Sequence, residues 1–443
     1  MAVVNFETLR AEIADIADTH AVGRVVEVGA GRIEVAKLAE IAAFGDRALI
    51  HMKSGAQLGA EVLALKGGTV TLLADGAADG VSLGDRVELL GQGGIYPDAS
   101  WVGRIVDPFG RPLDGRRIQR GRDERPVRAS PPPATSRKRL GKRLATGMTV
   151  FDTMLPLVRG QRIGLFAGSG VGKSSLLGQF AKGLDADVVV IALIGERGRE
   201  LREFVEQTLG PEGMKKAVLV AATSDQSPLV RRRCAWAAMT VAEYFRDKGR
   251  HVLFLADSVT RFAEAHREVA LAGGEQPSLR GYPPSTSHQI MSLAERAGPG
   301  HDHLDTPSGD ITAIFSVLVA GSDMEEPVAD ILRGVLDGHV ILDRKIAERG
   351  RFPAIDLLRS VSRSLPEAAT DDENRLIAKA RKHLGIYENS EMMIQAGLYT
   401  SGSDQAIDSA IRVWPKLDAF IAEFGANGCE QSFQKLSEAL VFE

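Results

Sequence analysis

The first quarter of the chain alternates between short apolar runs and glycine-containing breaks. Runs such as V-G-R-V-V-E-V from Val22 and T-V-T-L-L from Thr69 have the length and residue types of β-strands, and they follow one another at close spacing. Several short strands in succession are typical of a small barrel or sandwich. We therefore predict a small N-terminal β-domain, a barrel or a sandwich, over residues 22–95.

Before this region the apolar residues are spaced as in a helix. Phe6, Leu9, Ile13 and Ile16 fall on one helical face. The spacing predicts an amphipathic helix within residues 1–21. Such a helix either docks into a groove of a regulatory or tethering protein or folds back onto its own chain.

Residues 146–365 alternate between nearly continuous apolar runs and helical patterns. Strands that are buried on both faces have this composition, so we predict an α/β domain with a mainly parallel sheet and helices on both sides. Four runs carry the prediction: Val188–Leu193, Val218–Ala222, Val252–Ala256 and Ile311–Val319.

Two further segments differ in composition from these domains. Residues 96–145 are rich in arginine and proline, which predicts a linker and entry to the core, with the arginines either solvated or bound to an anionic partner. Residues 366–443 are predicted to form an α-helical C-terminal domain. Its expected helices are Glu373–Leu384, Glu391–Ala396, Gln405–Phe424 and Glu430–Leu440.

The composition is that of a globular protein outside the membrane. The 443 residues are 44% hydrophobic and 25% charged, with a net charge of −4, which argues against a dedicated nucleic-acid coat. Cys234 and Cys429 cannot form a disulfide framework. Without an apolar membrane span or a signal-peptide pattern, we expect a cytoplasmic protein, and peripheral attachment to a membrane through a partner stays open.

The sequence A-G-S-G-V-G-K-S, ending at Ser174, is a phosphate-binding loop. Its glycines allow successive N–H groups to converge on an anion, Lys173 adds a positive charge near the β- and γ-phosphates, and the Ser174 hydroxyl can bind Mg²⁺. The strict pattern has glycine where this chain has Ala167, but an apolar run precedes the loop and a helical pattern follows it. The predicted nucleotide contacts are Gly168, Ser169, Gly170, Val171, Gly172, Lys173, Ser174 and Ser175.

Two other runs end in groups suited to ATP hydrolysis. Asp257 closes H-V-L-F-L-A-D and would emerge at the carboxyl end of a buried strand, where it can contribute to the Mg²⁺ site or cap a helix. Glu196 and Arg197 follow the V-V-V-I-A-L run. A carboxylate at this position can accept a hydrogen bond from the attacking water, and the arginine can reach the γ-phosphate.

Five motifs in this order resemble the ATPases of type III protein export, most of all the bacterial flagellar export ATPase and more distantly the catalytic subunits of rotary ATP synthases. The resemblance covers residues 22–440. It implies a β-barrel, a RecA-like core and a helical C-terminal domain in a hexameric ring that energises export at the inner membrane. The motifs are A-G-S-G-V-G-K-S, G-E-R-G-R-E, D-S-V-T-R-F-A, G-Y-P-P-S and P-A-I-D-L-L-R-S-V-S-R.

The resemblance also implies roles for individual residues. Lys173, Ser174, Glu196, Arg197 and Asp257 match the phosphate, metal and catalytic positions already named. Phe352 matches an aromatic that lies against adenine, although a core phenylalanine is the alternative, and Tyr399 is a candidate for the second aromatic of that pocket. Arg363 matches the arginine finger given to a neighbour's site, the alternative being a surface arginine after a strand.

One chain carries both Glu196 and Arg363, whereas rotary synthases divide these two groups between subunit types. The pairing therefore predicts a homo-oligomer, expected to be a hexamer. The resemblance further implies an export gate, a stalk protein and export chaperone–substrate complexes as partners.

Two other functions stay open at this point. The same chemistry would serve a virulence type III secretion system. A RecA-like nucleic-acid motor would need a basic channel with aromatic side chains, but the N-terminal domain offers few aromatics, such as Phe44 and Tyr96, so no nucleic-acid partner is expected.

Overall fold

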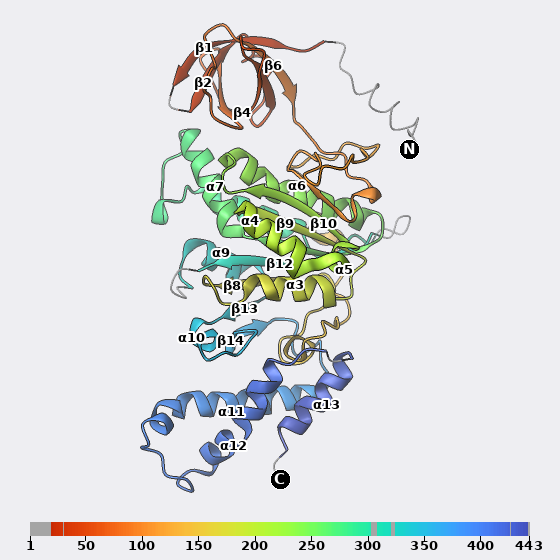
Figure 1. Ribbon diagram of the computed structural model, residues 1–443, viewed down its shortest axis with the longest axis vertical. Helices are drawn as coiled ribbons and strands as arrows, with labels where there is room; N and C mark the ends of the chain where they lie inside the picture. The colour runs from red at the N-terminus through yellow and green to blue at the C-terminus, as the bar shows by residue number, and fades with distance from the viewer. Residues whose placement is uncertain (1–18, 30, 303–307, 320–323, 426, 442–443) are drawn as a thin grey trace.

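The computed structural model describes residues 19–29, 31–302, 308–319, 324–425 and 427–441. They form a barrel, a central sheet covered by helices and a helical region, stacked along the long axis of the molecule (Figure 1). The predicted amphipathic helix at Phe6–Ile16 lies outside the described residues.

The N-terminal barrel confirms the fold expected for this part of the chain. Its strands close in the order β1-β2-β5-β4-β3-β6, and their alternate apolar residues, such as Val25, Ile33 and Leu72, are buried in its interior. The strands are β1 (Val22–Gly29), β2 (Arg32–Ala36), β3 (Arg47–His51), β4 (Gln57–Lys66), β5 (Thr69–Ala74) and β6 (Arg86–Gly91).

The central sheet has the strand order β14-β13-β8-β12-β11-β9-β10-β7 among the described residues. All neighbours are parallel except β13 and β14, so the prediction of a mainly parallel sheet is confirmed. The strands are β7 (Arg104–Val106), β8 (Arg162–Ala167), β9 (Val188–Glu196), β10 (Ala217–Thr223), β11 (His251–Asp257), β12 (Asp310–Leu318), β13 (Gly338–Leu342) and β14 (Ile355–Ser362).

Part of the segment expected to be a linker belongs to this sheet. β7 pairs with β10, and Trp101 just before it is buried, with its Nε1–H donating to the carbonyl of Gln119. The three-residue strand R-I-V is too short to show a period within an arginine-rich segment, which is why the sequence did not reveal it.

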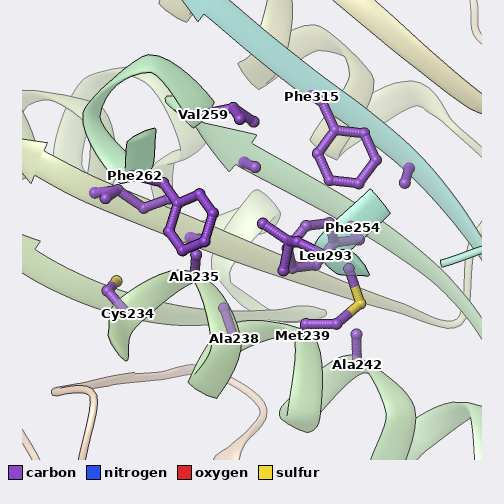
Figure 2. Close-up of a cluster of buried hydrophobic side chains, with 14 of the residues drawn as sticks. Cys234, Ala235, Ala238, Met239, Ala242, Phe254, Val259, Phe262, Leu293 and Phe315 are labelled. Carbon is purple, nitrogen blue, oxygen red and sulfur yellow. The ribbon is translucent and has the colours of Figure 1, made fainter. Parts of the chain in front are cut away.

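Helices cover both faces of the sheet. On one face, α6, α7 and α8 pack against Phe254 and Phe315, whose ring centroids are 5.8 Å apart (Figure 2). On the other face, α3 buries Leu177 and Phe180. The helices of this region are α2 (Thr149–Asp152), α3 (Lys173–Gly183), α4 (Gly198–Glu203), a π-helix (Phe204–Leu209), α5 (Gly210–Met214), α6 (Pro228–Asp247), α7 (Val259–Ala272), α8 (Ser285–Arg296), α9 (Pro327–Val335) and α10 (Arg344–Glu348).

The C-terminal region is helical, as predicted, but two of its expected helices are one. The helices are α11 (Asp371–Gln395), α12 (Gln405–Ile421) and α13 (Cys429–Ala439). The stretch between the two expected helices contains no proline. Tyr387 within it stacks on Trp414 of α12, with ring centroids 4.5 Å apart, and this packing keeps the helix continuous. Among the described residues, no helix is long and apolar enough to cross a membrane.

A buried polar network joins the barrel to the core. Glu61 of β4 accepts hydrogen bonds from Arg128 and from Arg232 of α6, where the Arg232 bond is 2.7 Å long. Arg232 also lies 3.5 Å from Nδ1 of His266 in α7, and the other ring nitrogen of His266 lies 2.8 Å from the Ser285 hydroxyl. Burial, and then the charge of Arg232, lowers the pKa of His266 to about 4.

This network predicts an acid-sensitive contribution to stability. Between pH 6.5 and 4 the unfolded chain protonates His266 while the folded chain does not, so the free energy of unfolding falls as the pH falls, by about 2 kcal/mol at pH 5. The melting temperature of His266→Gln should therefore fall less between pH 7.5 and pH 5 than that of the wild-type protein. The exposed His288→Gln is the control and should behave as wild type; an equal loss in both variants contradicts the assignment.

Candidate nucleotide-binding site

The phosphate-binding loop lies between the carboxyl end of β8 and the first turn of α3. Gly170 and Gly172 have φ angles of +77° and +87°, in the left-handed region that glycine adopts without strain. The loop leads directly into the N-terminus of α3, where free N–H groups and the helix dipole favour an anion. Ser174 and Ser175 are exposed in this first turn, so their hydroxyls are accessible to a ligand.

Asp257 meets the loop lysine at the carboxyl edge of the sheet. The carboxylate ends β11 and is only 3% exposed. Its Oδ1 accepts a hydrogen bond from Nζ of Lys173 and a second one, 2.8 Å long, from the hydroxyl of Ser316 in β12. The structure therefore joins the loop and the acid that the sequence had singled out separately.

Glu196 ends β9, which pairs with β11 in parallel, and it faces the same space. A pocket of about 140 Å³ is lined by Ser174, Glu196 and Asp257 together with residues of α4 and the π-helix. Burial, the nearby charge of Asp257 and a hydrogen bond with Glu200 raise the pKa of Glu196 to about 7. A carboxyl group in this range can accept a proton from water near neutral pH.

The pocket has the donors that Mg²⁺ prefers. Ser174 contributes a hydroxyl and Asp257 a carboxylate, and oxygen ligands of this kind suit a small, hard cation that keeps several waters and shares phosphate oxygens. These two residues therefore fit a magnesium ion that arrives with a nucleotide.

Arg197 is exposed beside the pocket. Its guanidinium lies 3.6 Å from the carboxylate of Glu200 in α4, and both side chains are largely accessible to solvent. An exposed pair of this kind contributes little to stability, so the arginine can exchange Glu200 for an anionic ligand at small cost.

Phe352 reaches the phosphate-binding loop from another part of the chain. A Cβ atom added to Gly172 would lie 3.2 Å from its ring, and Phe352 as a whole is 48% exposed. An accessible ring against the loop is suited to stacking on a base. Tyr399 lies in the helical region between α11 and α12, where its hydroxyl is 2.9 Å from both the Asp404 carbonyl and the Asp408 carboxylate.

Arg363 lies at the opposite end of the strands from the phosphate-binding loop of its own chain. Leu342 of β13 pairs with Ala167 beside the loop, whereas Gly338, at the other end of β13, pairs with Ser362. The two ends are about 13 Å apart along the strand. The Arg363 guanidinium is exposed and donates a 3.1 Å hydrogen bond to the carbonyl of Arg333.

Sequence reasoning missed several residues around the pocket. Ser316 donates a hydrogen bond to Asp257, Glu200 helps to raise the pKa of Glu196, and Thr208 lines the pocket. Ser316 had a detectable signal, because it is a polar residue within the apolar strand run I-F-S-V-L. Glu200 and Thr208 are polar residues in a polar stretch, so nothing in the sequence distinguishes them.

Comparisons with known proteins agree with this architecture. Residues 147–362 match the ATP synthase alpha/beta family, nucleotide-binding domain, and residues 369–427 match the T3SS EscN ATPase C-terminal domain. A protein named flagellum-specific ATP synthase from Caulobacter vibrioides is 43% identical over 95% of this chain and 96% of its own length. A type 3 secretion system ATPase from Xanthomonas euvesicatoria is 40% identical over 91% of this chain and 90% of its own length.

Solved structures give the same result for the fold. The assembled ATPase EscN from the type III secretion system of enteropathogenic E. coli superposes with a TM-score of 0.86 at 37% identity, covering 95% of this chain and 100% of that one. EscN in complex with its central stalk EscO superposes with a TM-score of 0.85 over the same shares of each chain. The chain thus belongs to the family of flagellar and type III secretion ATPases, within the ATP synthase alpha/beta family.

Proposed function

We propose that this ATPase energises the export of flagellar proteins and works at the cytoplasmic face of the bacterial inner membrane, to which it attaches peripherally. The proposal is supported by the relatives named flagellum-specific ATP synthase, which match nearly the whole chain. The observation that carries the catalytic part is the pocket in which the loop, Glu196 and Asp257 converge.

A virulence type III secretion system is the second candidate. The relative from Xanthomonas euvesicatoria and the structural likeness to EscN favour it, and the site chemistry would be the same. Deleting the gene separates the two roles. Loss of motility with normal effector secretion supports the flagellar role, and loss of effector secretion with normal motility supports the other.

In the proposed reaction the loop holds the phosphates and Glu196 activates the water. The backbone N–H groups of residues 168–175 and the Lys173 ammonium bind the β- and γ-phosphates, which requires Lys173 to turn from Asp257 toward the nucleotide. Glu196 orients the attacking water, and Arg197 reaches the γ-phosphate. Phe352 stacks on adenine, and Tyr399 is proposed as the second aromatic of that pocket.

Mg²⁺ is proposed to be held by Ser174 and Asp257. When bound, the ion neutralises charge on the phosphates during transfer. Asp257 is prepared for this role because it is buried and already fixed by two donors.

We infer that the active sites form between identical subunits of a hexameric ring. The pocket and Arg363 lie at opposite ends of the strands of one sheet. Acting as an arginine finger, Arg363 could therefore complete the pocket of a neighbouring copy but not that of its own chain. Because one chain carries both halves of the site, rotation of one subunit onto the next would repeat the same interface around a closed ring. The assembled ATPase EscN is the related precedent.

The partners of this ring are proposed from the same relationship. A stalk protein is expected, because EscN was solved in complex with its central stalk EscO. An export gate and export chaperone–substrate complexes would supply and receive the transported proteins, and a regulatory or tethering protein would bind the N-terminal segment.

The N-terminal segment gives a separate prediction. Deleting residues 1–20 should leave ATP turnover unchanged, because none of the proposed catalytic residues lies in this segment. The same deletion should reduce coprecipitation with proteins of the export apparatus from native cells. Phe6→Glu should reproduce the loss by placing a charge on the apolar face, and Glu7→Ala on another face should not. Unchanged coprecipitation of the truncated chain would contradict a docking role.

A further inference from the structure

The hydroxyl of Ser316 is buried in the sheet beneath the nucleotide pocket. β12 lies between β8, which leads to the phosphate-binding loop, and β11, which ends at Asp257. Ser316 is directly opposite Leu165 of β8, and Phe315 is opposite Ala256 of β11. The register therefore places Ser316 beside Asp257, between the two strands that carry the loop and the acid.

This serine breaks the apolar character of its strand. Phe315 and Val317 belong to the core cluster packed on α6, α7 and α8, and Ile314 belongs to the cluster on the α3 side. Because side chains alternate along a strand, Ser316 shares the α3 side with Ile314. It is 0% exposed, and a buried hydroxyl is retained at low cost only when it has a hydrogen-bond partner, which here is Asp257.

Ser316 and Lys173 donate to the same oxygen, Oδ1 of Asp257. Lys173 has a long flexible side chain and a second proposed task at the phosphates, so its contact with Asp257 is the one that nucleotide binding would weaken. The Ser316 hydroxyl is held by a central strand and cannot follow a ligand. It is therefore the donor that remains on the carboxylate throughout the reaction.

We propose that Ser316 is a positioning residue that sets the orientation of Asp257 for the magnesium ion of Mg²⁺–nucleotide. This inference rests on the proposed role of Asp257 at the metal. Partners that orient a metal-binding carboxylate typically change metal affinity or activity by about 10–100-fold when removed. Removing the Ser316 hydroxyl would thus change the Mg²⁺ dependence of nucleotide binding and would leave the phosphate-binding loop itself unaffected.

The test compares two variants that have nearly the same shape. Ser316→Thr keeps the hydroxyl, whereas Ser316→Val replaces it by a methyl group, so both add the same bulk to the strand and only one can donate to Asp257. Binding of the fluorescent N-methylanthraniloyl derivative of ADP is measured with Mg²⁺ titrated in and again in EDTA. Ser316→Ala, which adds no bulk, is measured alongside.

Ser316→Val and Ser316→Ala are expected to need about tenfold more Mg²⁺ for half-maximal enhancement of nucleotide binding, with affinity in EDTA unchanged. Ser316→Thr is expected to stay close to wild type. Wild-type Mg²⁺ dependence in Ser316→Ala would overturn the inference, as would equal losses in the threonine and valine variants.

Asp257→Asn separates this inference from the proposed function. If Asp257→Asn alters the Mg²⁺ dependence and Ser316→Ala does not, only the positioning role of Ser316 is rejected. If Asp257→Asn leaves the Mg²⁺ dependence unchanged, the proposed metal site is wrong and the inference is overturned with it.

Discussion

Replacing Arg363 by alanine is expected to lower ATP turnover about a thousandfold or more, while nucleotide binding stays close to wild type. Arginine fingers contribute about 10³–10⁵ to turnover because they meet charge that develops only in the transition state. Arg363→Lys should not rescue the activity, since a lysine lacks the planar fork of donors. Steady-state ATP hydrolysis and equilibrium binding of labelled ADP measure the two effects.

Arg359→Ala is a matched control, because Arg359 is another exposed arginine, on the edge strand β14 that directly precedes Arg363, and it pairs with Asp356. Its turnover should remain near wild type. An active Arg363→Ala protein would remove the finger assignment.

A mixing experiment then tests whether Arg363 acts on a neighbour. Subunits with Arg363→Ala and subunits with Glu196→Gln are each expected to be inactive alone. In mixed assemblies some interfaces combine an intact Glu196 with an intact Arg363 from the next copy, so part of the activity should return. If the mixture stays as inactive as its components, the proposed site between subunits is wrong.

Glu196→Gln is expected to reduce turnover by about 10²–10⁴, the usual contribution of a positioned acid or base. The amide keeps the size of the side chain, but it cannot accept a proton from water. Binding of Mg²⁺–ATP should be retained, because the phosphates are held by the loop and the metal residues. Single-turnover hydrolysis measured beside nucleotide binding separates the chemical step from affinity.

Glu200→Gln distinguishes the roles of the two neighbouring acids. Glu200 helps to raise the pKa of Glu196, but it lies on the exposed helix α4. Its replacement should leave turnover within about tenfold of wild type, whereas the proposed role of Glu196 requires a much larger loss. If Glu200→Gln is the more damaging of the two, Glu200 is the group that orients the water.

The sequence by itself determined the elements and the types of chemistry. The phosphate-binding loop, the strand before Asp257 and the strand before Glu196 are local patterns, because a glycine loop or an apolar run is read within about ten residues. The periodicity was sufficient for the mainly parallel sheet and for the N-terminal strands, but it left a barrel and a sandwich equally open, and the resemblance to the export ATPases implied the barrel. It failed where the signal was short or ambiguous, as in β7 and in the continuous helix α11.

Only the tertiary structure decided which of these groups meet. Lys173, Asp257 and Ser316 are far apart in the chain and come together because β8, β12 and β11 are adjacent in one parallel sheet. The antiparallel pairing of β14 with β13 placed Arg363 at the end of the strands away from the phosphate-binding loop of its own chain. Strand order and register depend on long-range pairing and shared burial, and these follow from the packing of the whole chain and not from any local run of residues.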